Sequence, residues 1–177
     1  MVFVKVNVTE REVMDPLADF GGEKIELNEI PSEISKISLF DNTKPNADVI
    51  LETIESRLEG MHQGVEIIHS QKPAGAGATP QELQKAAQGD VSILALGDCG
   101  SCTTWVILDA IRLEKEGVAT ISICSHKFVP FARKLAQAHG ADGLRIVEVE
   151  HPIAGREKDE VEEKTLRIVP DIKEILK

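Results

Sequence analysis

Residues 91–102 read VSILALGDCGSC, and this stretch decides the fold class. Its first half, residues 91–96, is a continuous apolar run, which is typical of a strand that is covered on both faces. The run passes through a short turn into a helical pattern that extends from about Thr103 to Glu116 and ends at Gly117. A buried strand that leads directly into a helix indicates a parallel sheet, because parallel strands need long crossover connections.

The same strand-then-helix unit recurs through most of the chain. Strands are predicted at residues 37–40, 65–69, 91–96, 118–123 and 144–149, each followed by a helical pattern. Five such units in a row predict an α/β fold, flavodoxin-like (Rossmann-like), with a doubly wound parallel five-stranded sheet. We expect residues 36–177 to form this single α/β domain, with the strands in the spatial order 2-1-3-4-5. Residues 71–78, rich in Gly and Ala, are predicted to be flexible.

Residues 1–35 fit this scheme less well and are interpreted as an N-terminal extension. Val2, Val4, Val6 and Val8 alternate with other residues, a period that is typical of a strand. The extension is therefore predicted to form either an extra edge strand of the sheet or an arm that reaches a second copy of the chain in a homodimer.

Composition and charge exclude several classes of partner. The chain has 177 residues and a net charge of −10, whereas proteins that bind nucleic acid present basic surfaces to phosphate. Aromatic residues make up 3% and Tyr is absent, so platforms for base stacking are missing as well. No apolar run approaches the roughly 20 residues that cross a bilayer, and no signal-peptide pattern is found. The three cysteines, an odd number, suit a reducing compartment, so we expect a cytoplasmic protein without nucleic-acid or membrane partners.

Residues suited to chemistry collect in the loops that follow the strands. In open parallel sheets, ligands bind beyond the carboxyl ends of the strands, where the strand order reverses. These loops comprise residues 41–46, 69–78, 97–102, 124–127 and 151–155, and all three cysteines lie in or beside them. In the order 2-1-3-4-5, the first loop faces the third across one crevice. The predicted substrate-binding residues of the crevice and its rim are Asp41, Asn42, Lys44, Asn46, Asp98, Gly100, Ser101, Thr103 and Ser125.

Cys99 and Cys102 are the predicted catalytic thiols. A cysteine at the N-terminus of a helix faces unpaired backbone N–H groups and the positive end of the helix dipole, which stabilise a thiolate. The Cys-x-x-Cys spacing is found in reversible disulfides and lowers a thiol pKa from about 8.5 to between roughly 3.5 and 7.5. His126 and His151 are predicted catalytic acid–base or anion-binding groups, because an imidazole titrates near neutral pH. Each of these histidines has an alternative interpretation as a loop residue that hydrogen-bonds the backbone.

Other interpretations of the same residues stay open. Cys99, Cys102, Cys124 and His126 come from adjacent loops and are able to form a Cys3His zinc site. The plainest alternative is a set of small residues that cap a buried helix. We predict no metal and no cofactor, because Gly-rich nucleotide-binding motifs are absent and the chain has no Tyr, and only one Trp, to stack on a flavin.

The stretch Gly97-Asp98-Cys99-Gly100-Ser101-Cys102-Thr103 resembles the signature of the UGSC family of (seleno)proteins, which is named for selenocysteine-Gly-Ser-Cys. Cys99 stands where many members carry selenocysteine, and the loop at residues 41–46 and His151-Pro152 are also similar to that family. A looser likeness links residues 99–123 to the selenoprotein subunits of glycine and proline reductases, through the Leu-Glu-Lys-Glu-Gly turn at residues 113–117. The resemblance implies a redox-active or nucleophilic position at Cys99.

The sequence thus predicts a thiol-dependent oxidoreductase that acts on a small molecule, with a thiol or a protein as electron donor. In this hypothesis the Cys99 thiolate attacks the substrate, and Cys102 resolves the adduct as an intramolecular disulfide. One alternative is a non-redox lyase or hydrolase with Cys99 as covalent nucleophile and His126 or His151 as general acid–base. Another alternative is a module that binds a metal or an anion in the same crevice.

Overall fold

The computed structural model describes residues 24–58 and 64–177, in which strands and helices alternate as the sequence predicts. The strands are β1 (Lys36–Asp41), β2 (Glu66–Gln71), β3 (Val91–Gly97), β4 (Ala119–Ser125) and β5 (Arg145–Val149). The helices are α1 (Ala47–Leu58), α2 (Pro80–Ala86), α3 (Gly100–Lys115), α4 (Val129–Ala138) and α5 (Lys158–Ile175). None of the helices in these described residues is both long enough and apolar enough to cross a membrane.

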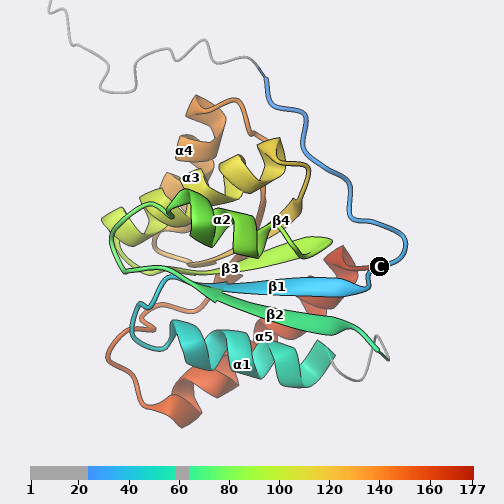
Figure 1. The fold of residues 1–177 in the computed structure, drawn as a ribbon. Coiled ribbons are helices and arrows are strands. Elements are labelled where there is room, and N and C mark those ends of the chain that lie inside the picture. Colours follow the sequence, from blue (N-terminus) through green and yellow to red (C-terminus); the bar gives the residue numbers. More distant parts are fainter. Residues whose placement is uncertain (1–23, 59–63) are drawn as a thin grey trace, which may run out of the picture.

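The strands of the described residues form one parallel sheet in the order β2-β1-β3-β4-β5 (Figure 1). This is the strand order of a flavodoxin-like fold, so the predicted fold class is confirmed. β1 and β3 are neighbours, with Phe40 opposite Leu94 and Asp41 opposite Ala95. The strand order reverses at this pair, and the loops after β1 and β3 therefore leave the sheet side by side.

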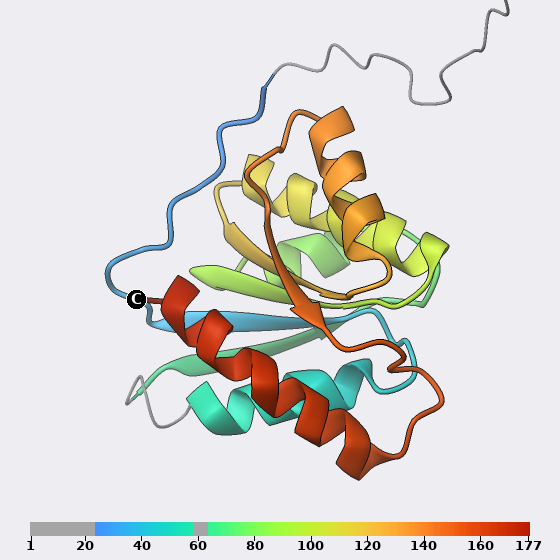
Figure 2. The same cartoon turned by 180° about the vertical axis from the view of Figure 1, so that it is seen from behind.

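Helices cover both faces of the sheet. α1 and α5 pack on one face and α2, α3 and α4 on the other, as Figures 1 and 2 show from opposite sides. Neighbouring β1 side chains point to different layers: Leu39 joins the core beneath α1 and α5, and Phe40 joins the core beneath α2 and α3. Every residue of β3 and β4 is buried, as expected for central strands that are covered on both faces.

α3 begins at Gly100, earlier than the start predicted near Thr103. Cys99 is its N-cap residue, and the Cys99 sulfur accepts a hydrogen bond from the Cys102 amide, 3.2 Å away. Sulfur thus takes the position that a Ser, Thr, Asp or Asn oxygen usually holds at the start of a helix. Consequently the Cys-x-x-Cys motif lies in the first turn of the helix rather than in a loop before it.

The described residues before β1 form an extended segment that contains no strand. The segment passes along the ends where the strands begin (Figure 1, blue). Asn28 Nδ2 donates a hydrogen bond to the Glu114 carbonyl near the end of α3, at 2.6 Å, and the Ser35 amide donates to the Asp90 carboxylate before β3, at 2.8 Å. The alternating valines at residues 2–8, on which the predicted edge strand or dimer arm depends, lie outside the described residues.

Candidate functional site

The first turn of α3 brings Cys99 and Cys102 together. Their sulfur atoms are in contact and their Cα atoms are 5.3 Å apart, a separation that a disulfide spans. Cys99 is half-buried, whereas Cys102 is 3% exposed, so an incoming molecule reaches the Cys99 sulfur first. Gly100 and Ser101 between them are exposed, and a Cβ atom at Gly100 would meet nothing within 4 Å. The outer surface of the turn is therefore open.

Hydrogen bonds hold Cys99 in place at the start of α3. Besides the Cys102 amide, the Ser101 hydroxyl approaches the Cys99 sulfur to 3.6 Å. The Cys99 carbonyl accepts hydrogen bonds from the Thr103 amide at 2.9 Å and the Thr103 hydroxyl at 2.7 Å. Thr103 is fully buried, so its hydroxyl positions the turn rather than facing the crevice. These contacts keep the Cys99 sulfur at the positive end of the α3 dipole.

The third cysteine, Cys124, lies apart from this pair. It is fully buried on β4 in the core beneath α3, and this burial raises the pKa of its thiol to about 12. Its sulfur packs against Gly97, where a Cβ atom would come within 2.6 Å, so only glycine permits this approach of β3 to β4. The alternative Cys3His zinc site is therefore not assembled. Within residues 24–58 and 64–177, no three His, Cys, Asp or Glu side chains gather as a metal ion would require.

Asp98, which follows β3, is bonded to His151 from the loop after β5. Asp98 Oδ1 lies 2.8 Å from His151 Nδ1, and Asp98 Oδ2 accepts hydrogen bonds from the amides of Ile153 at 3.2 Å and Ala154 at 2.9 Å. The hydroxyl of Ser125, the last residue of β4, lies 3.2 Å from the same histidine nitrogen. Residues from the carboxyl ends of β3, β4 and β5 thus meet at the Asp98–His151 pair.

The charge of Asp98 orients the His151 ring through Nδ1. Burial raises the pKa of Asp98, but hydrogen bonds from Ser125, the Ala154 amide, His151 and the Ile153 amide outweigh it and hold the pKa below its ordinary value. The carboxylate is therefore charged at neutral pH and accepts the proton on His151 Nδ1. With Nδ1 engaged in this way, Nε2 carries the lone pair of a neutral ring or the exchangeable proton of a protonated one, and the side chain is 30% exposed. This arrangement suits acid–base chemistry at Nε2.

His126 anchors the backbone of His151. The His126 Nδ1 atom accepts a hydrogen bond from the His151 amide, at 2.9 Å, so the neutral His126 ring carries its proton on Nε2. The two rings meet edge to face with their centroids 6.2 Å apart, and the Phe128 ring lies 5.8 Å from His151. Of the two predicted acid–base residues, His126 therefore makes the backbone contact that the alternative interpretation describes, whereas His151 Nε2 has no partner among residues 24–58 and 64–177.

Asn46 connects the start of α1 to the loop after β5. Its φ angle is 71°, a left-handed conformation that Asn adopts more readily than most residues. Asn46 Nδ2 donates hydrogen bonds to the carbonyls of Ile153 and Arg156, both at 2.9 Å. The amide group expected to face the crevice is thus used to hold the loop that carries His151.

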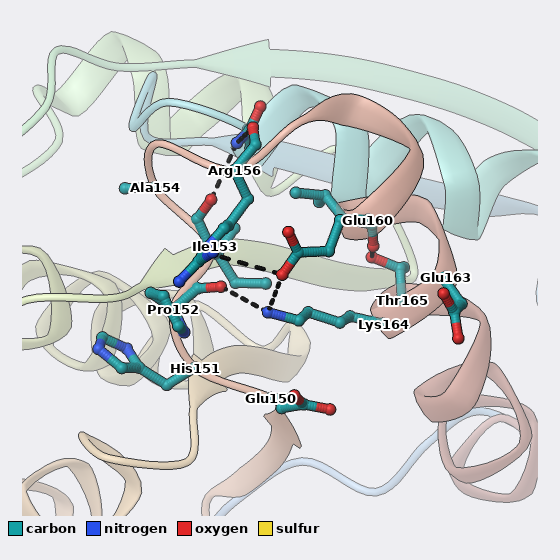
Figure 3. Close-up of polar contacts among 12 residues, drawn as sticks. Glu150, His151, Pro152, Ile153, Ala154, Arg156, Glu160, Glu163, Lys164 and Thr165 are labelled. Carbon is teal, nitrogen blue, oxygen red and sulfur yellow. Dashed lines mark hydrogen bonds and ion pairs between the residues drawn. The ribbon is translucent and has the colours of Figure 1, made fainter.

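Lys164 on α5 holds the same loop from the other side. Its side chain is 7% exposed, and its Nζ donates to the Pro152 carbonyl at 2.9 Å and pairs with Glu160 at 2.8 Å. Figure 3 shows Lys164 between Pro152 and Glu160, with the His151 ring on the opposite side of the loop. The loop after β5 is therefore fixed on several sides, and it presents His151 away from α5.

The loop after β1 lies at the same end of the sheet as Cys99, as predicted. Asn42 is 1% exposed, and its amide exchanges two hydrogen bonds of 2.9 Å with the backbone of Leu96 on β3. This pair joins the two sides of the predicted crevice. The Asn42 side chain is thus fully engaged with protein atoms, and its place in the structure is that of a positioning residue.

Asp41 and Lys44 border open space on this loop. A cavity of about 450 Å³ is lined by Asp41, Thr43, Lys44, Pro45, Asn46 and Asp48. Burial raises the pKa of Asp41, although a hydrogen bond from the Thr43 amide opposes this effect, and the charge of Asp48 adds to it. Lys44 is half-buried, and its ammonium group has no hydrogen bond or ion pair within the part of the chain that the structure describes. Lys44 is therefore available to an anionic ligand.

Sequence reasoning missed the buried charges behind residues 72–78. Lys72 Nζ lies 3.2 Å from Asp109 Oδ2 on α3 and also bonds the Ala76 carbonyl, and the two charged side chains are 2% and 0% exposed. Asp109 also accepts the Ala78 amide on both carboxylate oxygens, at 3.1 Å. The stretch predicted to be flexible is therefore fixed against α3. The one available signal was the position of Asp109 within an apolar run of that helix, Val106, Ile107, Ala110 and Ile111.

The order of the strands defines a flavodoxin-like α/β domain. At the start of one of its helices the sulfur atoms of two cysteines are in contact. The model of the UGSC family matches residues 12–177, and the chain therefore belongs to the UGSC family. No curated protein matches the chain.

Comparison with solved structures finds matches to two flavodoxins. A short-chain flavodoxin associated with a non-canonical PDU bacterial microcompartment is 9% identical, with 82% of this chain and 100% of that chain covered and a TM-score of 0.47. The flavodoxin of Streptococcus pneumoniae TIGR4 is 12% identical, with 78% of this chain and 97% of that chain covered and a TM-score of 0.46. At these identities and TM-scores neither match assigns a property to this chain, and its fold class rests on the strand order.

Proposed function

We propose that this chain is a thiol-dependent oxidoreductase that acts on a small molecule, with Cys99 as the attacking thiol and Cys102 as the resolving thiol. The observation that supports this most directly is the contact between the two sulfurs in the first turn of α3. Exposure separates their roles, because Cys99 lies at the open surface of the turn and Cys102 is 3% exposed behind it. An oxidised substrate meets Cys99, and the adduct then lies next to Cys102.

The position of Cys99 favours the reactive form of its thiol. The thiolate is the nucleophile in thiol chemistry, and a helix N-terminus stabilises it. In this chain the Cys102 amide donates directly to the Cys99 sulfur at 3.2 Å, and the Ser101 hydroxyl is 3.6 Å from it. By contrast, burial raises the pKa of Cys124 to about 12, so that thiol stays protonated and unreactive at neutral pH.

The proposed cycle has two half-reactions. In the first, the Cys99 thiolate attacks one atom of a disulfide or peroxide bond, which breaks; one fragment stays on Cys99 and the other leaves and takes up a proton. Cys102 then attacks the Cys99 sulfur, which forms the disulfide and releases the second fragment. In the second half-reaction, a dithiol donor supplies two electrons and two protons, becomes a disulfide itself and returns both cysteines to thiols.

A non-redox reaction is the second candidate, and the Asp98–His151 pair favours it. A histidine whose tautomer is fixed by a carboxylate, with Nε2 free, is suited to proton transfer beside a covalent nucleophile in a lyase or hydrolase. In such a reaction Cys99 remains essential, but Cys102 takes no part in the chemistry. Replacement of Cys102 alone therefore separates the two candidates, because a redox enzyme loses turnover and a lyase retains it.

Intact-mass measurements test the proposed couple. After mild peroxide treatment of the reduced protein, the peptide that contains Cys99 and Cys102 should lose two hydrogens, and a dithiol should restore them. Cys124→Ala is the matched control, because it removes a thiol that lies outside the pair and should leave this oxidation unchanged. If Cys99 instead advances to sulfinic acid while Cys102 stays reduced, the resolving role is wrong and the covalent-nucleophile candidate takes its place.

A further inference from the structure

We infer that the substrate reduced at Cys99 releases its leaving group on oxygen, as an organic hydroperoxide does, because a rigidly held acid–base histidine accompanies the thiol. The inference rests on the proposed thiol chemistry and adds the class of substrate to it. Three features support it: the fixed geometry of His151, its connection to the residue before Cys99, and the different needs of oxygen and sulfur leaving groups.

His151 is held at its ring and at its backbone. Its Nδ1 lies 2.8 Å from Asp98 Oδ1, and its amide donates to His126 Nδ1 at 2.9 Å. The residues that follow are bound by the second Asp98 oxygen, through the Ile153 and Ala154 amides. Within the part of the chain that the structure describes, Nε2 is the one polar atom of this ring without a partner, and it can exchange a proton with a ligand. A preorganised proton donor of this kind acts without a cost of reorganisation at the moment of reaction.

Asp98 links this histidine to the thiol. Asp98 and Cys99 are consecutive, so their Cα atoms are about 3.8 Å apart. Ser125 is the last residue of β4. Its hydroxyl lies 3.2 Å from His151 Nδ1 and 3.4 Å from the carbonyl of Gly97, the residue before Asp98. His151 and Cys99 therefore lie at the same carboxyl end of the sheet, connected through Asp98, which bonds the one and precedes the other in the chain.

The benefit of a proton donor depends on the leaving group. A thiol has a pKa of about 8.5, so a disulfide releases a thiolate near neutral pH with little need of a proton. A hydroperoxide must release an alkoxide or hydroxide, and the pKa of water is about 15.7, so expulsion without a proton is costly. General acid catalysis contributes roughly 10²–10⁴-fold where a proton is needed. A built acid–base pair beside a thiol therefore fits an oxygen leaving group.

The proposed step balances in atoms and electrons. The Cys99 thiolate attacks the terminal oxygen of ROOH, the O–O bond breaks and an S–O bond forms, and the protonated His151 gives its Nε2 proton to the departing RO group. The products are Cys99 sulfenic acid, ROH and neutral His151, with sulfur oxidised by two electrons. The Cys102 thiol then displaces the hydroxyl group as water and forms the disulfide, which a dithiol reduces.

Parallel oxidation by two reagents tests this inference on the full chain. The reduced protein is mixed with cumene hydroperoxide or with a small aromatic disulfide, the remaining thiols are alkylated, and oxidation of Cys99 is followed by mass spectrometry. His151→Asn should slow the hydroperoxide reaction about 100-fold and the disulfide reaction less than about 3-fold. His69→Asn is the matched control, because His69 is 64% exposed at the edge strand β2 and pairs with Glu55. It should change neither rate.

Asp98 is tested as a positioning residue through the pH profile. Asp98→Asn removes the charge that fixes the His151 tautomer, so the dependence of the hydroperoxide rate on pH should change while the disulfide reaction keeps its profile. Circular dichroism and thermal unfolding report whether each variant is folded. His151→Gln provides a second variant with the same loss of acid–base function if His151→Asn does not fold.

The outcomes separate this inference from the proposed function. If wild-type Cys99 is oxidised by the disulfide but resists the hydroperoxide, the oxygen leaving group is wrong and the thiol oxidoreductase stands. If His151→Asn slows both reagents equally, His151 acts on the thiol rather than on the leaving group, and the inference is overturned. If neither reagent oxidises Cys99, the proposed function and the inference fall together.

Discussion

Replacement of Asn42 by alanine should destabilise the protein strongly, although Asn42 lies in a loop. Asn42 Nδ2 donates to the Leu96 carbonyl and Asn42 Oδ1 accepts from the Leu96 amide, both at 2.9 Å. Leu96 is 0% exposed and Asn42 is 1% exposed, so water does not reach either backbone group. The variant removes both partners at once and leaves a buried donor and a buried acceptor unpaired.

The expected loss of stability follows from these two unpaired backbone groups. Each buried polar group left without a partner costs about 1–3 kcal/mol, so two groups cost about 2–6 kcal/mol of the free energy of unfolding. For a domain of 150–250 residues, 1 kcal/mol corresponds to a shift in Tm of about 2–4 °C, which gives a decrease of roughly 4–24 °C.

Urea denaturation and thermal unfolding measure this loss directly. Lys44→Ala is the matched control from the same loop, because the Lys44 ammonium makes no bond to the described residues. It should change the free energy of unfolding by no more than about 0.5 kcal/mol. A loss below about 1 kcal/mol for Asn42→Ala, or an equal loss for both variants, would refute the role of Asn42 as the link between β1 and β3.

Three further predictions follow from buried charges and thiols. Lys72→Met removes a cation that faces the fully buried Asp109 and should cost about 3–5 kcal/mol in urea unfolding; a change below about 1 kcal/mol would contradict the role of this pair. Hydrogen bonds lower the pKa of Asp98 against the effect of burial, so its contribution to stability is present above pH of about 4 and is lost as pH falls through the folded-state pKa. The unfolding free energies of wild type and Asp98→Asn should therefore converge on acidification, and a constant difference would count against it. Burial raises the pKa of Cys124 to about 12, so its stabilising effect is complete below pH of about 8.5 and declines above it. Iodoacetamide at pH 8 should accordingly label Cys99 in the reduced folded protein and label Cys124 only after unfolding, as peptide mapping would show.

The architecture was within reach of the sequence because it depends on local periodicity. Residues 91–96 predict a strand covered on both faces, and every residue of β3 is in fact buried. Repetition of the same unit predicts a parallel sheet, and its order places the loop with Asn42 at the end where Cys99 lies. The start of α3 was predicted too late, because a cysteine N-cap lacks the oxygen that usually signals a helix N-terminus.

The contacts around His151 were out of reach because they join distant parts of the chain. Asp98 meets His151 across 53 positions of sequence and the Ala154 amide across 56. An Asp directly after a strand is equally compatible with a helix cap, a catalytic base or a substrate ligand. The role of Asp98 depends on which groups the loop after β5 places beside it. The Lys72–Asp109 ion pair was not predicted for the same reason. The sequence around Lys72 is rich in Gly and Ala, a composition that is typical of a solvated loop.

Polar residues after the strands serve two purposes here, and burial distinguishes them where residue type does not. Asn42 and Asn46 use their amides to hold backbone from β3 and from the loop after β5, and so do not offer them to a ligand. Among the described residues, His151 Nε2 and the Lys44 ammonium have no such partner, and the Cys99 sulfur, although bonded to the first turn of α3, lies at an open surface. Substitutions should sort accordingly. A change in the first group alters the free energy of unfolding and affects the rate only through displaced neighbours, whereas a change in the second group alters the rate directly, and at Lys44 it leaves the stability nearly unchanged.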